Sequence, residues 1–152
     1  MEIERKYLPE YLPEHLEQYP CKKIEQAYLC TEPVVRIRRS DDDYYLTYKS
    51  KGFLVREEYN LPLNRESYLH LRDKADGIVL SKTRYLIPFL DNLTIELDLF
   101  DAPYEGLALA EVEFPDETSA NSFVPPEWFG EDVTYSAAYH NSTLSRGKGP
   151  KK

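Results

Sequence analysis

The chain has 152 residues, 41% of them hydrophobic, which is enough for one folded domain with a sizeable core and argues against a disordered chain. Its formal net charge of −8 argues against a nucleic-acid or membrane-surface binder. No apolar run reaches the ~20 residues that span a bilayer, and the acidic N-terminus shows no signal peptide, so we expect a cytoplasmic protein. Cys21 and Cys30 match no metal-ligand spacing, and we interpret them as reduced structural thiols.

Segments that alternate between polar and apolar residues recur along the chain, as expected of β-strands. They are residues 2–8, 24–30, 34–39, 44–50, 54–61, 78–88, 93–100 and 107–114. Turn signals such as Lys51-Gly52 and Asp91-Asn92 separate neighbouring segments and indicate hairpins. The pattern predicts eight strands in an antiparallel sheet or barrel.

Short helices are predicted between and after the strands, at residues 9–19, 65–75, 117–123 and 135–141. Asn64 is a suitable N-cap for the second helix, and Thr134 for the last. The sequence has no internal linker, repeat or low-complexity block, so we expect one domain over residues 1–144. The basic residues 145–152 are expected to form a mobile tail.

Seven of the eight predicted strands have one charged face and one mainly apolar face. The bases on the charged faces are Lys6, Arg36, Arg38, Lys49, Arg56, Lys82 and Arg84, and the acids are Glu2, Glu4, Glu58, Glu96, Asp98, Glu111 and Glu113. A solvated sheet face would explain scattered charges. Like-charged pairs two residues apart, however, repel each other unless opposite charge lies between them. The alternative is a closed barrel with a charged interior that has room for a small ligand, its apolar outer face covered by the helices.

The chemistry of the charged faces indicates the kind of ligand. Clustered bases need a polyanion, and arginine offers paired donors to phosphate oxygens. Clustered carboxylates need metal cations, and Mg²⁺ typically combines one or two carboxylates with substrate phosphates. A metal-bound polyphosphate meets both requirements, so we interpret Glu2 and Glu4 as metal ligands and Lys6 as a phosphate ligand.

The order and spacing of these charged pairs resemble the CYTH superfamily, the triphosphate tunnel metalloenzymes. The segment EIERKYL resembles the family's ExExK signature, and TIELDLF and AEVEF resemble its later acidic strands. The basic strands are similar in VRIRR, LTYKSKG, VREEYNLPL and LSKTRYLI, and the ending WFGEDVTYSAAYHNSTL is similar to that of short bacterial members. The resemblance covers roughly residues 1–144.

This resemblance implies an α+β fold, an eight-stranded antiparallel closed barrel with a charged tunnel and a few helices packed outside. It implies hydrolysis of a triphosphate with Mg²⁺ or Mn²⁺, held as two ions. The phosphate-binding positions are Lys6, Arg36, Arg38, Lys49, Arg56, Lys82 and Arg84. The metal positions are Glu2, Glu4, Glu111 and Glu113, with Glu58, Glu96 and Asp98 as further acidic wall positions. The catalytic set is Glu2, Glu4, Lys6, Glu111 and Tyr28, although Tyr28 also fits a plain strand aromatic.

Several alternatives remain at this stage. The short members resemble inorganic tripolyphosphatases, which give pyrophosphate and phosphate, but the scaffold also hosts class IV adenylate cyclases and thiamine triphosphatases. A non-catalytic polyphosphate- or nucleotide-binding module is the rival of a different class. Asn60 stands where the family segment usually ends in glutamate, which leaves metal preference open. The oligomeric state, monomer or homodimer, also stays open.

Residues outside the charged faces are given structural interpretations. His15, His70 and His140 have no partners in a catalytic spacing, and we expect them at the surface or in structural roles. The segment Trp128-Phe129-Gly130 is expected to pack on the barrel exterior or at one mouth.

Overall fold

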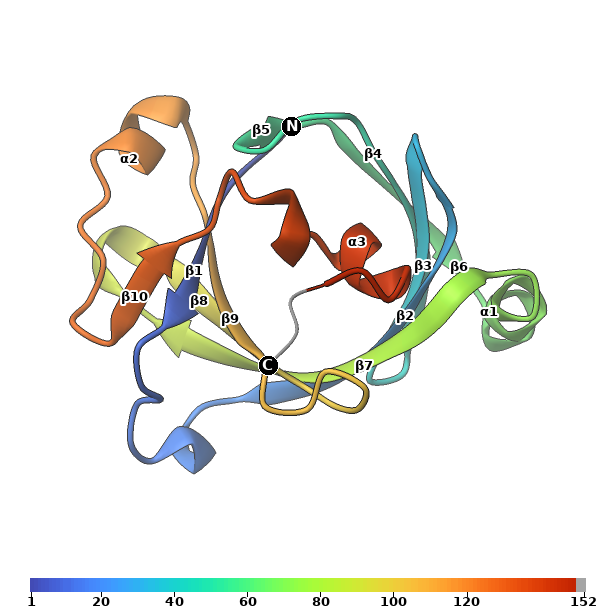
Figure 1. Ribbon diagram of the computed structural model, residues 1–152, viewed down its shortest axis with the longest axis horizontal. Coiled ribbons are helices and arrows are strands. Elements are labelled where there is room, and N and C mark those ends of the chain that lie inside the picture. The colour runs from blue at the N-terminus through green and yellow to red at the C-terminus, as the bar shows by residue number, and fades with distance from the viewer. Residues whose placement is uncertain (150–152) are drawn as a thin grey trace.

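The computed structural model of the chain describes residues 1–149 and shows strands arranged around a central opening (Figure 1). The strands are β1 (Glu2–Pro9), β2 (Cys21–Thr31), β3 (Val34–Ser40), β4 (Asp43–Lys49), β5 (Val55–Arg56), β6 (Glu58–Leu63), β7 (Asp76–Pro88), β8 (Thr94–Phe100), β9 (Ala108–Glu113) and β10 (Phe129–Asp132). The helices are α1 (Arg65–Arg72), α2 (Glu117–Asn121) and α3 (Asn141–Ser145), with single 3₁₀ turns η1 (Leu16–Gln18), η2 (Leu90–Asn92) and η3 (Ala137–Tyr139).

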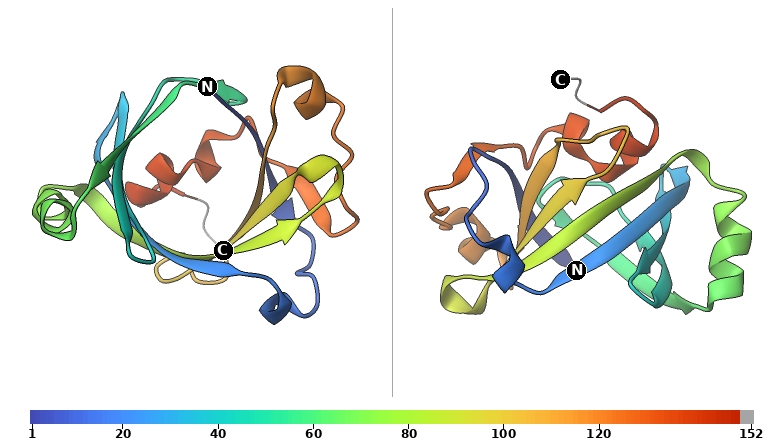
Figure 2. Two further views of the ribbon diagram at one scale, coloured as in Figure 1. Left: turned by 180° about the vertical axis from the view of Figure 1, so that it is seen from behind. Right: turned by 90° about the horizontal axis from the view of Figure 1, so that it is seen from below.

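The sheet closes on itself through one bent segment. Its strand order is β10-β1-β9-β8-β7-β2-β3-β4-β6, all pairs are antiparallel, and β5 pairs with β1. Because β5 and β6 follow each other with only Glu57 between them, their pairing with β1 and β4 joins the two sides of the sheet (Figure 2). The barrel predicted from the sequence is confirmed, with a different strand count: the predicted strand 54–61 forms both β5 and β6, and β10 was not predicted.

The apolar side chains lie on the outer face of the barrel, as the alternation predicted. One buried cluster, which includes Ile3, Tyr7, Leu97 and Phe129, packs between the barrel and the layer formed by α2 and β10. This cluster confirms the packing role of the Trp128-Phe129-Gly130 segment. A second cluster forms where Tyr68 of α1 covers the outer faces of β2 and β3. The helical layers therefore leave the inner faces free for charged groups.

Two helix predictions were correct and two were wrong. Helices α1 and α2 form near the predicted positions, and the Asn64 side chain caps α1 by accepting a hydrogen bond from the Ser67 N–H at 2.7 Å. The helix predicted at 9–19 is absent, because β1 continues to Pro9, which with Pro13 disfavours a helical run, and only η1 forms. The helix predicted at 135–141 is replaced by η3 and α3. The Thr134 hydroxyl does not cap a helix; it accepts a hydrogen bond from the Lys6 N–H at 3.0 Å.

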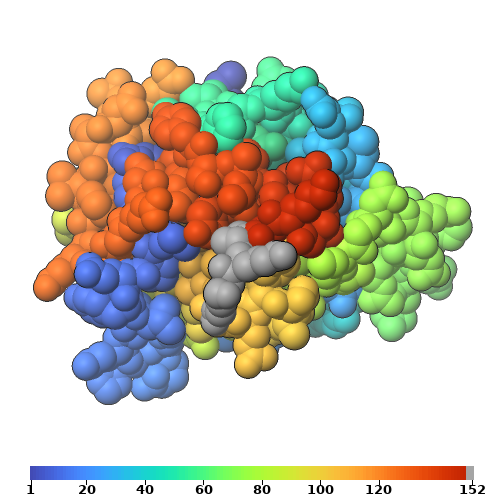
Figure 3. All heavy atoms as spheres, viewed as in Figure 1, coloured from blue at the N-terminus to red at the C-terminus, as the bar shows by residue number. Residues whose placement is uncertain are grey.

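The C-terminal segment corrects the expectation that all helices pack outside. The segment of η3 and α3 lies across one mouth of the barrel, where it covers the centre of the face in the space-filling view (Figures 1 and 3). The Val133 N–H donates to the Lys6 carbonyl at 2.8 Å and anchors this segment on β1. Ser145, assigned to the tail by sequence, is a buried residue of α3, and residues 150–152 of that predicted tail lie outside the described residues. In residues 1–149, no helix is both long and apolar enough to cross a membrane.

Candidate active site

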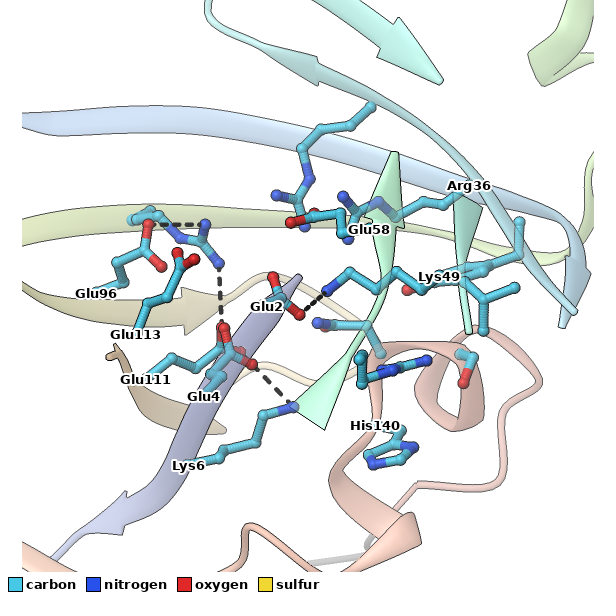
Figure 4. Close-up of a pocket in the computed structure, with 17 residues that line it drawn as sticks. Glu2, Glu4, Lys6, Arg36, Lys49, Glu58, Glu96, Glu111, Glu113 and His140 are labelled. Carbon is cyan, nitrogen blue, oxygen red and sulfur yellow. Dashed lines mark hydrogen bonds and ion pairs between the residues drawn. The ribbon is translucent and has the colours of Figure 1, made fainter. Parts of the chain in front are cut away.

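A polar cavity of about 170 Å³ lies inside the barrel, under η3 and α3 (Figure 4). It is lined by Glu2, Glu4, Lys6, Tyr28, Val34, Arg36, Arg38, Lys49, Arg56, Glu58, Arg84, Glu96, Glu111, Glu113, His140, Asn141 and Ser142. Thirteen of these seventeen residues belong to the set of fifteen that the sequence nominated. Strand alternation and antiparallel register bring them together, because side chains two apart share a face.

The carboxylates gather at the wall formed by β1, β8 and β9. One oxygen from each of Glu4, Glu96 and Glu111 lies within 4.8 Å of the other two. The β1–β9 register sets Glu4 opposite Glu113, and the β8–β9 register sets Glu96 opposite Glu111. Three converging carboxylate oxygens match the hard oxygen donors that Mg²⁺ and Mn²⁺ prefer, so this donor set fits a divalent cation.

The protonation of these carboxylates reflects their crowding. Burial, followed by the neighbouring charge of Glu111, raises the pKa of Glu4 well above its ordinary value. Burial, followed by Glu2 and Glu58, likewise raises the pKa of Glu113. Burial alone would raise the pKa of Glu111, but the charges of Lys6 and Arg84, with smaller contributions from Lys82 and Lys49, together hold that pKa well below normal. Crowded carboxylates of this kind favour a bound cation, which would relieve their mutual repulsion.

On this wall the bases are paired with acids. Arg84 binds Asp98 through two hydrogen bonds, Nε to Oδ1 at 2.7 Å and Nη2 to Oδ2 at 2.9 Å, and its Nη1 donates to Glu96 at 3.2 Å. Lys6 Nζ lies 3.6 Å from Glu111 Oε1. Near the β4 side, Lys49 Nζ donates to Glu2 Oε1 at 2.9 Å. Burial would raise the pKa of Glu2, but the charge and hydrogen bond of Lys49, with a hydrogen bond from Glu58, together lower it.

The bases of β3 have neutral partners instead. Arg38 donates from Nε at 2.9 Å and from Nη2 at 2.5 Å to the same oxygen, Gln26 Oε1. Arg36 Nη2 donates to the Thr47 hydroxyl at 3.2 Å, and that hydroxyl donates to Asn60 Oδ1 at 2.5 Å. Asn60 is an exposed residue that accepts a hydrogen bond from Thr47, and it does not line the cavity.

Two nominated residues lie behind the cavity lining. Lys82 Nζ and Asp98 Oδ2 are 2.7 Å apart, and both side chains are completely buried. Burial lowers the pKa of Lys82 to about 7 despite the attraction of Asp98. In the structure these residues form a buried ion pair within the wall, linked to the cavity through Arg84.

The remaining nominated residues lie at the cavity as predicted. Tyr28 is buried, lines the cavity and pairs across the β2–β3 ladder with Arg36. Arg56 lines the cavity and is held by a hydrogen bond from its Nε to the Ser50 carbonyl at 3.0 Å. Burial raises the pKa of Glu58 despite the attraction of Lys49 and Arg36, and repulsion from Glu2 adds to the rise.

The C-terminal segment adds residues that sequence reasoning missed. His140, Asn141 and Ser142 line the cavity, a location that the sequence did not predict for His140; His15 and His70 are exposed, as expected. Lys6 Nζ donates to the Tyr139 carbonyl at 3.1 Å, which ties this segment to the inner wall. The segment Tyr139-His140-Asn141 belongs to the ending that resembles short bacterial family members, which was the available sequence signal. No local pattern showed that this segment folds back over the mouth of the barrel.

His140 lies in a cationic environment. Burial, followed by the charges of Lys6, Arg56 and Lys49, lowers its pKa to about 4. Its ring packs against Phe53 at a centroid distance of 5.2 Å, and Phe53 also contacts Tyr135 at 6.1 Å. Both Cys21 and Cys30 are free thiols in the structure.

A closed antiparallel barrel with clustered carboxylates on one inner wall and arginines on another defines an interior for a polyanion and a divalent cation. The CYTH domain model matches residues 1–143, and this chain belongs to the CYTH family. An inorganic triphosphatase from Nitrosomonas europaea is 37% identical over 148 residues, covering 95% of this chain and 96% of that protein. An inorganic triphosphatase from Acetivibrio thermocellus is 38% identical over 113 residues, covering 72% and 70%.

Solved structures share the fold. The crystal structure of the inorganic triphosphatase NE1496 aligns with a TM-score of 0.71 at 34% identity, covering 96% of this chain and 95% of that one. A putative adenylyl cyclase from Hippeastrum aligns with a TM-score of 0.59 at 15% identity, covering 80% and 83%. The second likeness concerns the fold alone, so the substrate must be argued from the cavity.

Proposed function

We propose that this protein hydrolyses inorganic tripolyphosphate to pyrophosphate and phosphate, with Mg²⁺ or Mn²⁺ bound by the carboxylate wall. One observation carries the proposal: a single cavity holds the Glu4–Glu96–Glu111 cluster together with Arg36 and Arg38, whose hydrogen-bond acceptors are neutral. Relatives that cover nearly the whole chain and are named inorganic triphosphatase support it.

The cavity size favours a compact substrate. At about 170 Å³ it is smaller than the ~300–1,000 Å³ typical of pockets for organic ligands. A triphosphate chain without a nucleoside or thiamine fits such a space more readily than ATP or thiamine triphosphate. The number of carboxylates argues against a pure polyphosphate-binding module, because binding a polyanion alone would not require Glu2, Glu4, Glu96, Glu111 and Glu113 around it.

The residues of the chain have distinct roles in this reaction. Arg36, Arg38 and Lys49 bind and orient phosphate oxygens, and Lys6 and Arg84 stabilise the charge that develops on the leaving phosphate. The oxygen of the attacking water forms a bond to phosphorus as the bridging P–O bond breaks. The water proton passes to a carboxylate of the cavity wall.

The cation site is proposed from the same residues. Glu2, Glu4, Glu96, Glu111 and Glu113 offer enough oxygen donors for two ions. A bound divalent cation would neutralise phosphate charge and lower the pKa of a coordinated water.

The broader assignments rest on the same features. We propose a single catalytic domain over residues 1–144 in the cytoplasm, consistent with two free thiols. We propose no nucleic-acid partner, because the net charge is −8.

Phosphate release tests the proposal. We expect rapid release from tripolyphosphate with Mg²⁺ or Mn²⁺, none in EDTA, and slower release from ATP and thiamine triphosphate. Glu4→Gln should lower kcat by about 100-fold or more, because it removes a charged ligand from the cluster. The matched control is Glu14→Gln, whose side chain is 92% exposed, and it should leave the rate unchanged. Cyclic AMP formation from ATP without phosphate release from tripolyphosphate would indicate a cyclase, and tight binding without turnover would indicate a binding module.

A further inference from the structure

The inner face of β3 carries two buried guanidinium groups without an acidic partner. Arg36 is 3% exposed and Arg38 is 6% exposed. Within residues 1–149, no carboxylate oxygen lies within 4.0 Å of either guanidinium. Buried charges of this kind are normally paired, because removing a charge from water is costly.

Gln26 is the residue that holds Arg38. It lies on β2, is completely buried, and faces Arg38 across the β2–β3 ladder. Its Oε1 accepts both hydrogen bonds from Arg38, whereas its Nε2 has no hydrogen-bond partner in the described residues. A glutamate of the same shape would accept the same two bonds, pair with the cation and leave no buried donor unsatisfied.

Arg84 shows the alternative arrangement within the same barrel. It also projects into the cavity, but it makes two hydrogen bonds to the Asp98 carboxylate. The pKa of Arg84 is raised well above normal, because Asp98 and Glu96 outweigh the effect of burial. Burial, followed by the charges of Arg36 and Arg84, lowers the pKa of Arg38. Unlike Arg84, Arg38 therefore has no carboxylate beside it among the described residues.

We propose that Gln26 is a positioning residue that fixes the Arg38 guanidinium through a neutral acceptor, so that its full charge is available to the anionic end of the substrate. This inference rests on the proposed function and deepens it, because it gives the triphosphate a direction in the cavity. Figure 4 shows Arg36 and Lys49 on the side of the cavity away from Glu96 and Glu111. One end of the triphosphate lies at the carboxylate cluster, and the other lies at Arg36 and Arg38.

The test is Gln26→Glu, which keeps the shape and both acceptor bonds but neutralises Arg38. We expect the KM for tripolyphosphate to rise at least tenfold, with kcat within about threefold of wild type, because the added charge acts on binding. Calorimetric titration with tripolyphosphate in EDTA should show the same weakening without turnover. The melting temperature should not fall, since the variant gains an ion pair. A merely structural glutamine would leave KM unchanged in the neutral variant Gln26→Met, which removes the acceptor of Arg38 without adding a charge.

The matched control is Gln18→Glu, the same substitution at an exposed residue of η1. It changes the net charge equally, so its KM should match wild type. Unchanged tripolyphosphate binding by Gln26→Glu would overturn the proposal, as would an equal loss in the control. If Gln26→Glu does not fold, Gln26→Met replaces it: we expect a KM about threefold higher, and an unchanged KM would overturn the proposal.

The calorimetric measurement separates this inference from the proposed function. If wild type binds tripolyphosphate but does not hydrolyse it, the proposed function fails, and weaker binding by Gln26→Glu still supports the role of Gln26. If wild type neither binds tripolyphosphate in EDTA nor hydrolyses it with Mg²⁺ or Mn²⁺, both fail.

Discussion

Buried bases have carboxylate partners on one wall of the barrel and neutral partners on another. On the β7–β8 wall, Lys82 and Arg84 share the Asp98 carboxylate, with separations of 2.7 Å for both Lys82 Nζ and Arg84 Nε. On the β3 wall, Arg36 and Arg38 bind only the neutral oxygens of Thr47 and Gln26. The comparison shows that the bases of the first wall are neutralised by carboxylates within the protein, whereas those of the second wall have no carboxylate within 4.0 Å among the described residues.

The largest expected effect is a loss of stability on the β7–β8 wall, where the bases are paired with a carboxylate. Asp98→Asn leaves Lys82 and Arg84 without their shared carboxylate, and breaking a buried ion pair costs about 3–5 kcal/mol. We expect the free energy of unfolding to fall by that amount, measured by urea denaturation at pH 7. Asp42→Asn, at a fully exposed side chain, should change it by less than about 0.5 kcal/mol. A loss at Asp98 no larger than the loss at Asp42 would contradict the structural role of this wall.

On the β3 wall, where the bases have neutral partners, removing a base should not lower the stability of the protein. Arg36→Met removes a buried cation whose Nε has no hydrogen-bond partner in the described residues, so the free energy of unfolding should stay unchanged or rise. The KM for tripolyphosphate should rise about tenfold or more, a loss of about 1.4 kcal/mol of binding free energy. Steady-state kinetics and urea denaturation of one preparation measure both. Arg65→Met, at an exposed residue of α1, is the control; destabilisation by Arg36→Met without a change in KM would remove the contrast between the walls.

The smallest effect concerns His140, which faces the cations from the C-terminal segment. Burial and the charges of Lys6, Arg56 and Lys49 lower its pKa from 6.5 to about 4, so between these values the unfolded chain binds a proton that the folded protein does not. This contribution to stability is fully present above about pH 6.5 and is lost as the pH falls toward 4. In EDTA without phosphate, the melting temperature of His140→Gln should therefore fall less steeply than that of wild type over this range. His15→Gln, at an exposed histidine, should follow wild type; identical slopes for all three proteins would show that His140 is not held neutral.

Much of the site could be predicted because successive side chains of a strand point to opposite faces of the sheet. In the ExExK segment, alternation alone assigns Glu2, Glu4 and Lys6 to one face, whatever the neighbouring strands are. The same reasoning identified twelve residues of the cavity lining, and the family resemblance added Tyr28. It could not separate Lys82 and Asp98 from the others, since how deep a residue lies within a wall depends on the neighbouring strands.

The sequence by itself determined the two faces of each strand and the acids and bases that share a face, because the two-residue period of a strand is a local property of the backbone. The closed barrel was predicted from the family resemblance, since alternation alone fits an open sheet as well. Only the tertiary structure decided which base meets which acid, since partners such as Arg84 and Asp98 come from separate strands whose register sets their contact. It also placed Gln26 behind Arg38 and brought His140 to the cavity. Both depend on contacts between residues distant along the chain, which no local pattern encodes.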